Sequence, residues 1–339
     1  MTLSIAGMKV LVTGAGGFLG STISKQLLRE DCEVTGFSRG SYPALAAAGV
    51  EMKQGDIRDY GRLATVAASH DAIVHTAAVA GVWGPRKLFH SINVDGTTNV
   101  IQACRELGIS KLVFTSSPSV TFDGEHQRNL GECADYPTKW LAHYPHTKAL
   151  AEQAVLDANS SDLATVALRP HLIWGPGDPH LIPRVLDRGS RNRLRIIGEG
   201  SNQVDMVYVD NAAQAHLCAL KSLEIGSLIS GKSYWVTQQQ PVKLWDWINE
   251  ILTLAGIRNV KSKVSAKLAY RIGGKLEFVY KVLRIQSEPP MTRFVAKQLS
   301  TDHYFDNSAA RDELGFKPQI STQDGMLRLA EWIRNTKAD

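Results

Sequence analysis

The sequence has few cysteines and no long apolar run. Its 339 residues contain four scattered cysteines, Cys32, Cys104, Cys133 and Cys218, and no Cys-x-x-Cys pair. This usage excludes a disulfide framework or a zinc site and is typical of small core residues in a reducing compartment. No apolar stretch is long enough to span a bilayer, and we expect no secretory signal, because the first apolar run reads as a strand. We therefore expect a cytoplasmic protein, with at most peripheral contact to the inner membrane.

An excess of charge of one sign is also missing. The formal net charge is +5 at pH 7 and charged residues make up 21% of the chain, so charge does not favour nucleic-acid binding. An apolar content of 44% is ordinary for a soluble protein. A chain of this length can bury a full core, and we expect one large domain with a smaller lobe.

Strand-like and helical segments alternate through the first half of the chain. Apolar or β-branched runs predict strands at 8–12, 33–37, 50–53, 72–76, 111–115 and 164–168. Helical periodicity predicts helices between them, at 21–30, 89–107 and 147–159. This order predicts an α/β fold with a doubly wound parallel sheet, of the Rossmann type.

Two domains follow from the change of pattern near residue 176. We place the dinucleotide-binding domain at 1–175, with 204–222 returning to it, and a smaller substrate lobe mainly at 176–339. In the C-terminal half we expect a strand at 233–237 and helices at 242–254 and 322–336.

Three glycines at a spacing of three directly follow the first predicted strand. Gly14, Gly17 and Gly20 lie in the segment TGAGGFLG, which leads into the first helix. Such a turn lets backbone N–H groups approach a pyrophosphate at the helix N-terminus. A plain tight turn between strand and helix is the alternative.

Tyr144 and Lys148 carry the clearest sign of acid–base chemistry. Their spacing of four places both on one face of a helix. A nearby ammonium favours the phenolate, so we expect a lowered pKa for Tyr144, which would make it a proton donor or acceptor. A chance occurrence of this spacing is the alternative.

Polar residues follow two other predicted strands. Ser116 and Ser117 come after 111–115, at the sheet edge where open α/β sheets bind ligands. Their hydroxyls either bond a substrate carbonyl or cap a turn. Asp56 either bonds an adenine ring or caps the helix near Asp59.

Several short motifs stand in an order that resembles the extended short-chain dehydrogenase/reductase family. The segments are 13–20, 55–56, 77–78, 93–97, 115–117, 144–148 and 169–170, which cover nearly the whole chain. The resemblance implies a catalytic set of Ser117, Tyr144 and Lys148 and no metal. It also implies support of the active site by Asn93, whose alternative role is to cap the helix that starts at Gly96.

The same resemblance implies a nicotinamide dinucleotide on the glycine turn. The implied contacts are Gly14, Gly17, Phe18, Leu19, Gly20, Ser38, Arg39, Asp56, Ile57, Ala77, Ala78, Tyr144, Lys148 and Pro170. NAD-selective members end the second strand with an acidic residue. Here Ser38 and Arg39 stand at that place, and a guanidinium suits a 2′-phosphate. We therefore expect NADP(H).

Segments 79–85, 168–176, 288–294 and 305–309 resemble the branch of this family that acts on sterols and related lipids. More narrowly, the chain is similar to bacterial reductases of long-chain olefin biosynthesis. That likeness implies NADPH-dependent reduction of the 3-ketone of a 2-alkyl-3-oxoalkanoate, a long-chain lipid-like keto acid, with a β-lactone synthetase and a decarboxylase acting downstream. The alternatives are a 3β-hydroxysteroid or sterol dehydrogenase, a nucleotide-sugar epimerase and an NADP-sensing regulator.

A basic apolar stripe at 264–283 fits a lipid substrate. Apolar residues recur there at spacings of three and four, and Lys and Arg outnumber Glu. Such a helix either lies on an anionic membrane or lids an apolar pocket, or it packs as an ordinary lobe helix. Apolar residues on more than one side of 89–107 and 147–159 further predict a homodimer paired through these helices.

Overall fold

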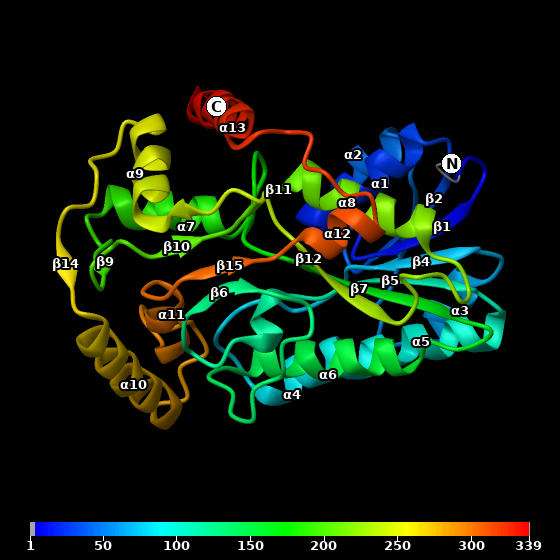
Figure 1. The fold of residues 1–339 in the computed structure, drawn as a ribbon, viewed down its shortest axis with the longest axis horizontal. Helices are drawn as coiled ribbons and strands as arrows, with labels where there is room; N and C mark the ends of the chain where they lie inside the picture. Colours follow the sequence, from blue (N-terminus) through cyan, green and yellow to red (C-terminus); the bar gives the residue numbers. More distant parts are fainter. Residues whose placement is uncertain (1–3, 339) are drawn as a thin grey trace.

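A seven-stranded parallel sheet forms the centre of the larger domain. The computed structural model describes residues 4–338. The strand order is β12-β7-β5-β4-β1-β2-β3 (Figure 1). The bounds are β1 Lys9–Thr13, β2 Glu33–Ser38, β3 Glu51–Gln54, β4 Ala72–His75, β5 Lys111–Thr115, β7 Ala164–Pro170 and β12 Lys232–Val236. The order reverses between β1 and β4, and ligands of doubly wound sheets bind outside that point. The predicted fold class is confirmed.

Helices cover both faces of this sheet (Figure 1). On one face lie α1 Phe18–Arg29, α2 Pro43–Ala47, α8 Val209–Ser222 and α12 Ser308–Glu313. On the other lie α3 Tyr60–Ala67, α4 Arg86–His90, α5 Gly96–Leu107 and α6 His143–Asp157. Each face has a core of its own: Leu27 and Leu220 are fully buried in one, and Val100 and Val155 in the other. Burial of two opposite sheet faces explains why the central strands are apolar along their whole length.

The strand expected at 233–237 belongs to the large sheet. β12 pairs in parallel with β7, with Tyr234 beside Leu168 and Val236 beside Pro170. The sequence analysis assigned this strand to the C-terminal half and its lobe, because periodicity shows a strand but not its partner. Its place beside β7 extends the edge of the sheet that α6 contacts.

The smaller lobe is assembled from the segments that follow β7. Its strands are β8 Ile173–Trp174, β9 Ile196–Ile197, β10 Gln203–Val204, β11 Val207–Tyr208, β13 Val242–Lys243, β14 Lys263–Val264 and β15 His303–Phe305. Its helices are α7 Leu181–Ser190, α9 Leu244–Leu254, α10 Ala266–Val282, α11 Arg293–Gln298 and α13 Thr322–Ala338. Trp174 and Trp247 meet edge to face, with ring centroids 5.5 Å apart, and are buried in a third core.

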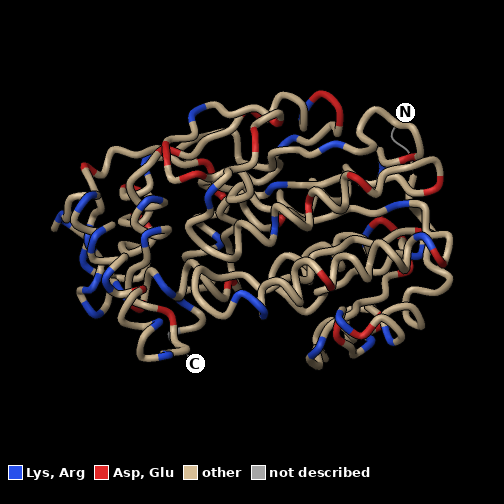
Figure 2. The backbone as a smooth tube through the Cα atoms, turned by 90° about the horizontal axis from the view of Figure 1, so that it is seen from below, with Lys and Arg blue, Asp and Glu red and all other residues tan. Residues whose placement is uncertain are grey.

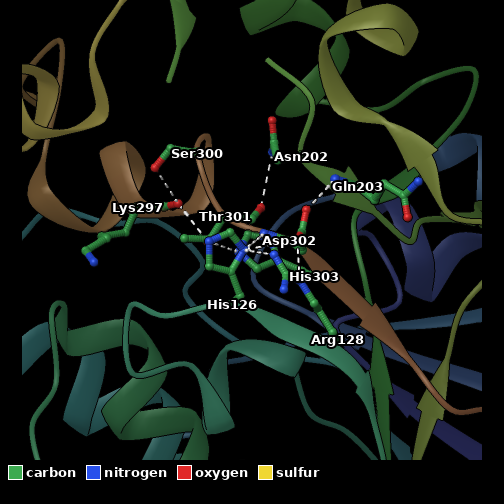
Figure 3. A network of polar contacts seen from close by, with 9 residues as sticks. All are labelled: His126, Arg128, Asn202, Gln203, Lys297, Ser300, Thr301, Asp302 and His303. Carbon is green, nitrogen blue, oxygen red and sulfur yellow. Dashed lines mark hydrogen bonds and ion pairs between the residues drawn. The ribbon is translucent and has the colours of Figure 1, made fainter. Parts of the chain in front are cut away.

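A four-stranded sheet joins this lobe to the first half of the chain. Its order is β13-β10-β15-β6, where β6 is Gln127–Leu130. The Asp302 carboxylate accepts hydrogen bonds from Arg128 Nε at 2.6 Å and from the backbone N–H of Gln203 at 2.8 Å (Figure 3). One side chain therefore fixes the ends of three strands that are distant in sequence.

The helix expected at 89–107 is interrupted by a wider turn. Residues Ser91–Asp95 form a π-helical turn between α4 and α5. The turn directs the side chain of Asn93 into the interior, where it is 1% exposed. Such turns often mark functional sites, and this one lies beside the catalytic helix.

Helix α10 departs from ordinary packing. Only Ala269 and Gly273 are buried on it, whereas Leu268, Ile272 and Phe278 are exposed. Of the apolar stripe, Val264 packs against the core of the small lobe and Leu276 is partly buried, whereas Leu268, Ile272, Val279 and Leu283 are exposed. Within residues 4–338, none of the helices combines the length and apolar character needed to cross a membrane.

The four cysteines are all unpaired. Cys32 and Cys104 are buried and Cys218 is partly buried, as expected for core residues. Cys133 is exposed, which corrects that expectation for this position. It lies in the loop between β6 and α6, where nothing is packed over it.

Candidate active site

The structure brings Ser117, Tyr144 and Lys148 to the carboxyl end of β5. Ser117 follows β5 and opens a short helical turn at Pro118–Thr121 (η2), and its hydroxyl acts to lower the pKa of Tyr144. Tyr144 and Lys148 lie one turn apart on α6. Pro145 stands in the first turn of that helix, where its missing N–H costs nothing. Ser117 also accepts from the N–H of Ser119 at 3.3 Å, so it both caps a turn and faces the tyrosine.

Burial sets the protonation of this pair. Lys148 is 3% exposed, and burial lowers the pKa of its ammonium to about 7, against the charge of Glu152. Its Nζ donates to the carbonyl oxygen of Thr115 at 2.6 Å and lies 4.0 Å from the centre of the Phe114 ring. Burial raises the pKa of Tyr144, and the bond from Ser117 opposes this only in part. The expected lowering of the Tyr144 pKa is therefore wrong, because Lys148 is directed at Thr115 and Phe114.

Asn93 connects the catalytic helix to the loop after β4. Its Oδ1 accepts from the N–H of Val79 at 2.8 Å, and its Nδ2 donates to Thr147 Oγ1 at 3.1 Å. It makes no cap bond to α5, and the N-cap residue Asp95 makes no side-chain cap bond either. Of its two expected roles, Asn93 therefore takes the one that supports the active site.

A buried polar chain extends from the glycine turn to Asn93. Thr97 Oγ1 donates to the carbonyl oxygen of Asn93 at 2.7 Å, so His75 Nε2 must donate to Thr97. His75 Nδ1 then accepts from Thr13 Oγ1 at 2.6 Å. Burial lowers the pKa of His75 to about 3, which keeps the ring neutral. The sequence analysis did not find these residues, although polar side chains at the ends of two apolar strands were a signal.

The glycine turn fits a dinucleotide phosphate. Gly14 has φ +73°, and a Cβ there would lie 2.7 Å from the backbone nitrogen of Ala77. A Cβ on Gly20 would lie 2.3 Å from the carbonyl oxygen of Gly14. Helix α1 starts immediately after Gly17, which gives it no side-chain cap, so its first N–H groups remain available to an anion.

The end of β2 lies beside this turn. Ser38 Oγ accepts from the N–H of Gly16 at 2.9 Å, while Arg39 is exposed and makes no ion pair within residues 4–338. The ring of Tyr42 lies against Gly16, since a Cβ there would fall 2.0 Å from it. Tyr42 is thus a further residue at the dinucleotide turn that the sequence analysis missed.

The other residues expected to contact the cofactor lie either at the carboxyl ends of the strands or in the hydrophobic cores. Ala77, Ala78 and Pro170 lie at or beyond the carboxyl ends of β4 and β7. Leu19 and Ile57 are buried in the two cores, so only their backbones face the turn region. Asp56 does not cap α3; Asp59 does, and the Asp56 carboxylate accepts from Arg58 at 2.7 Å.

A cleft of about 1030 Å³ opens beside the start of α6. Its walls are the loop at 82–86, residues 140–143 with His146, and the C-terminal half of α10 with 284–286. Trp83 holds the two sides together: its Nε1 donates to the carbonyl oxygen of Ile285 at 3.3 Å, and its ring meets Tyr280 edge to face. His143 lines the cleft and directly precedes Tyr144 in α6.

The sheet order and the serine–tyrosine–lysine set define an extended short-chain dehydrogenase/reductase with a Rossmann-type fold. Residues 11–267 match the 3-beta hydroxysteroid dehydrogenase/isomerase family, and the chain belongs to that family. It is 47% identical to a 2-alkyl-3-oxoalkanoate reductase of Shewanella oneidensis, over 94% of this chain and 84% of that one. It is 30% identical to the mouse sterol-4-alpha-carboxylate 3-dehydrogenase, decarboxylating, over 98% of this chain and 92% of that one.

A solved structure with the same fold is a double mutant of a dTDP-glucose 4,6-dehydratase from Streptomyces venezuelae, which has NAD bound. The TM-score is 0.76 at 23% identity, and the match covers 98% of each chain. This likeness concerns the fold, including the small lobe.

Proposed function

We propose that this protein reduces the 3-ketone of a 2-alkyl-3-oxoalkanoate to the 3-hydroxy acid. The observation that supports the proposal is a cleft with apolar and basic walls at the start of α6, the helix that carries Tyr144 and Lys148. Family membership and the relatives named above support an oxidoreductase. A sterol dehydrogenase is the second candidate, because the family name and the mouse relative favour it.

The tyrosine supplies the proton. Its raised pKa keeps the phenol protonated at neutral pH, which suits a group that gives a proton to a ketone oxygen. Ser117, whose hydroxyl acts on the pKa of Tyr144, orients the same oxygen. A nicotinamide cofactor, when bound, supplies the hydride.

The cofactor we propose is NADP(H). The glycine turn and the uncapped start of α1 would hold its pyrophosphate. At the end of β2, Arg39 is unpaired and exposed, and no acidic residue stands there to take the 2′-hydroxyl.

The groove along α10 suits the alkyl chains of such a substrate. A second hollow of about 700 Å³ lies over Leu268, Ile272 and Val279. It shares the lining residues Gly274 and Phe278 with the cleft of about 1030 Å³ beside the start of α6. A chain that leaves the cleft can therefore continue along an apolar helix face. The product would pass to a β-lactone synthetase and a decarboxylase of long-chain olefin synthesis.

A direct comparison of substrates tests the proposal. The purified protein is assayed with NADPH and a 2-alkyl-3-oxoalkanoate, and in parallel with a 3-ketosteroid. We expect turnover of the keto acid and its loss in Tyr144→Phe, while NADPH binding measured by fluorescence is retained. Turnover of the steroid alone would favour the second candidate, and near-normal turnover in Tyr144→Phe would exclude the mechanism.

A further inference from the structure

The cleft beside the start of α6 is lined by more positive than negative side chains. Four cationic side chains line it, from Arg86, Lys281, Arg284 and Arg293. The one carboxylate on the lining, Glu277, accepts from Arg293 Nε at 2.7 Å and from its backbone N–H at 2.6 Å. The other three cations make no ion pair and no side-chain hydrogen bond within residues 4–338. Charge of one sign in a cleft attracts ligands of the opposite sign.

Two of these cations act on His143, the first residue of α6. Burial and then the charges of Arg86 and Lys281 lower the pKa of His143, and Arg86 acts in the same sense on His146. Arg86 lies on α4 and Lys281 on α10, and both line the cleft. An anion held between them therefore lies beside His143, the residue next to Tyr144.

We propose that Arg86 and Lys281 bind the carboxylate of the substrate. This inference rests on the proposed function. In a 3-oxo acid the carboxylate is attached to the carbon next to the ketone, so a ketone presented to Tyr144 carries its carboxylate to the region of His143. A guanidinium and an ammonium from two walls would fix that group and with it the face of the ketone.

The apolar part of the cleft explains why a carboxylate is needed for orientation. The cleft has apolar surfaces on Trp83, Trp140 and Phe278. These surfaces can bind alkyl chains but do not fix the orientation of the substrate, because apolar contacts are not directional. Two charge-assisted hydrogen bonds supply direction, because their geometry is restrictive. The same cations could serve a phosphate of a nucleotide sugar, and the experiment below separates the two anions.

The test compares an acid with its methyl ester. A 2-alkyl-3-hydroxyalkanoate and its ester are oxidised with NADP⁺ by the wild type and by Arg86→Gln, Lys281→Gln and the double variant. Binding of the acid to the protein with NADP⁺ is measured separately by calorimetry. We expect the KM and the Kd of the acid to rise about tenfold or more in each single variant, with little change in kcat or in the KM of the ester.

Lys87→Gln is the matched control, because Lys87 adjoins Arg86 on α4 but does not line the cleft. It should leave the acid and the ester unaffected. Equal losses for acid and ester in Arg86→Gln would overturn the carboxylate site while the proposed function stands. Failure of the wild type to oxidise either compound would instead remove the proposed function. Binding of UDP-glucose that Arg86→Gln abolishes, without binding of the acid, would assign the cations to phosphate and overturn the inference.

Discussion

At the scale of single residues, we propose that Arg39 sets the preference of the protein for NADPH over NADH. Its guanidinium is free of ion pairs in the described part of the chain, and only NADPH carries a 2′-phosphate for it to meet. We expect Arg39→Ala to weaken NADPH binding by about 1.5–3 kcal/mol, the usual contribution of a hydrogen bond to a charged group. Fluorescence titration measures the effect, and NADH serves as the internal control. Equal weakening of both cofactors would show that Arg39 does not read the phosphate.

Lys148 should make cofactor binding depend on pH. Burial lowers its pKa to about 7, so above that pH the free protein holds a neutral amine. If the charged form binds the cofactor, binding above pH 7 must take up a proton, and affinity falls as pH rises, by up to about tenfold per unit. Titration of NADPH across neutral pH, with Lys148→Met as the comparison, measures this. If the affinity of Lys148→Met for NADPH still falls with rising pH, another titratable group causes the pH dependence.

At the scale of elements, a buried ion pair fastens α6 to β7. Arg169 on β7 and Glu152 on α6 are 3% and 0% exposed, with Nη2 and Oε1 2.6 Å apart. The Arg169 guanidinium also lies 4.6 Å from the ring centre of Trp235 on β12. We expect Glu152→Gln to lower the free energy of unfolding by about 3–5 kcal/mol, because it leaves a buried charge uncompensated. Urea denaturation measures the change.

An exposed pair provides the control for this prediction. Asp187 and Arg191 are bonded at 2.8 Å on the surface of α7 and just beyond it, and both are more than half exposed. Asp187→Asn should cost less than about 1 kcal/mol. Similar losses in the two variants would mean that the buried pair contributes no more than a surface one.

Helix α10 is the element we propose to meet a membrane. Phe278 is 68% exposed and Leu268 51%, and the basic residues Lys267, Arg271 and Lys275 stand on the same helix. Figure 2 shows Lys and Arg gathered at the end of the molecule that carries α10 and β14. An exposed apolar face with basic residues suits an anionic bilayer. We expect the protein to float with vesicles that contain phosphatidylglycerol and not with pure phosphatidylcholine.

Substitution of that face tests whether α10 is responsible. The triple variant Leu268→Ser, Ile272→Ser and Phe278→Ser should lose flotation and raise the KM for long-chain substrates more than for short ones. Leu228→Ser is the control, since Leu228 is 66% exposed on the loop before β12. Flotation retained by the triple variant, with unchanged thermal stability, would show that α10 is not the contact.

At the scale of the whole molecule, we propose that two copies pair through α5 and α6. Most apolar residues that suggested a second face, such as Val100 and Val155, are buried in the chain's own core. Val94, Leu150 and Ala154 remain partly exposed. Light scattering at micromolar concentration should give a molecular mass twice that of one chain. The variant Leu150→Arg should have the mass of a single chain. A single-chain mass for the wild type would contradict the proposal.

The features that depend on residues close together in the chain could be predicted from the amino-acid sequence. The strands of the large sheet and the glycine turn between β1 and α1 were predictable, because apolar periodicity and turn chemistry act over a few residues. The helix with Lys148 was predicted at 147–159, whereas α6 starts at His143 and so includes Tyr144 as well.

Contacts between residues far apart in the chain became visible only in the tertiary structure. The pairing of β12 with β7, the chain from Thr13 through His75 to Thr97, and the direction of the Lys148 ammonium toward Thr115 each join distant segments. The raised pKa of Tyr144 belongs here too, since burial comes from the whole packed site and not from the lysine one turn away. The cleft is likewise formed by three separate segments, so its excess of positive charge could be seen only once the chain had folded.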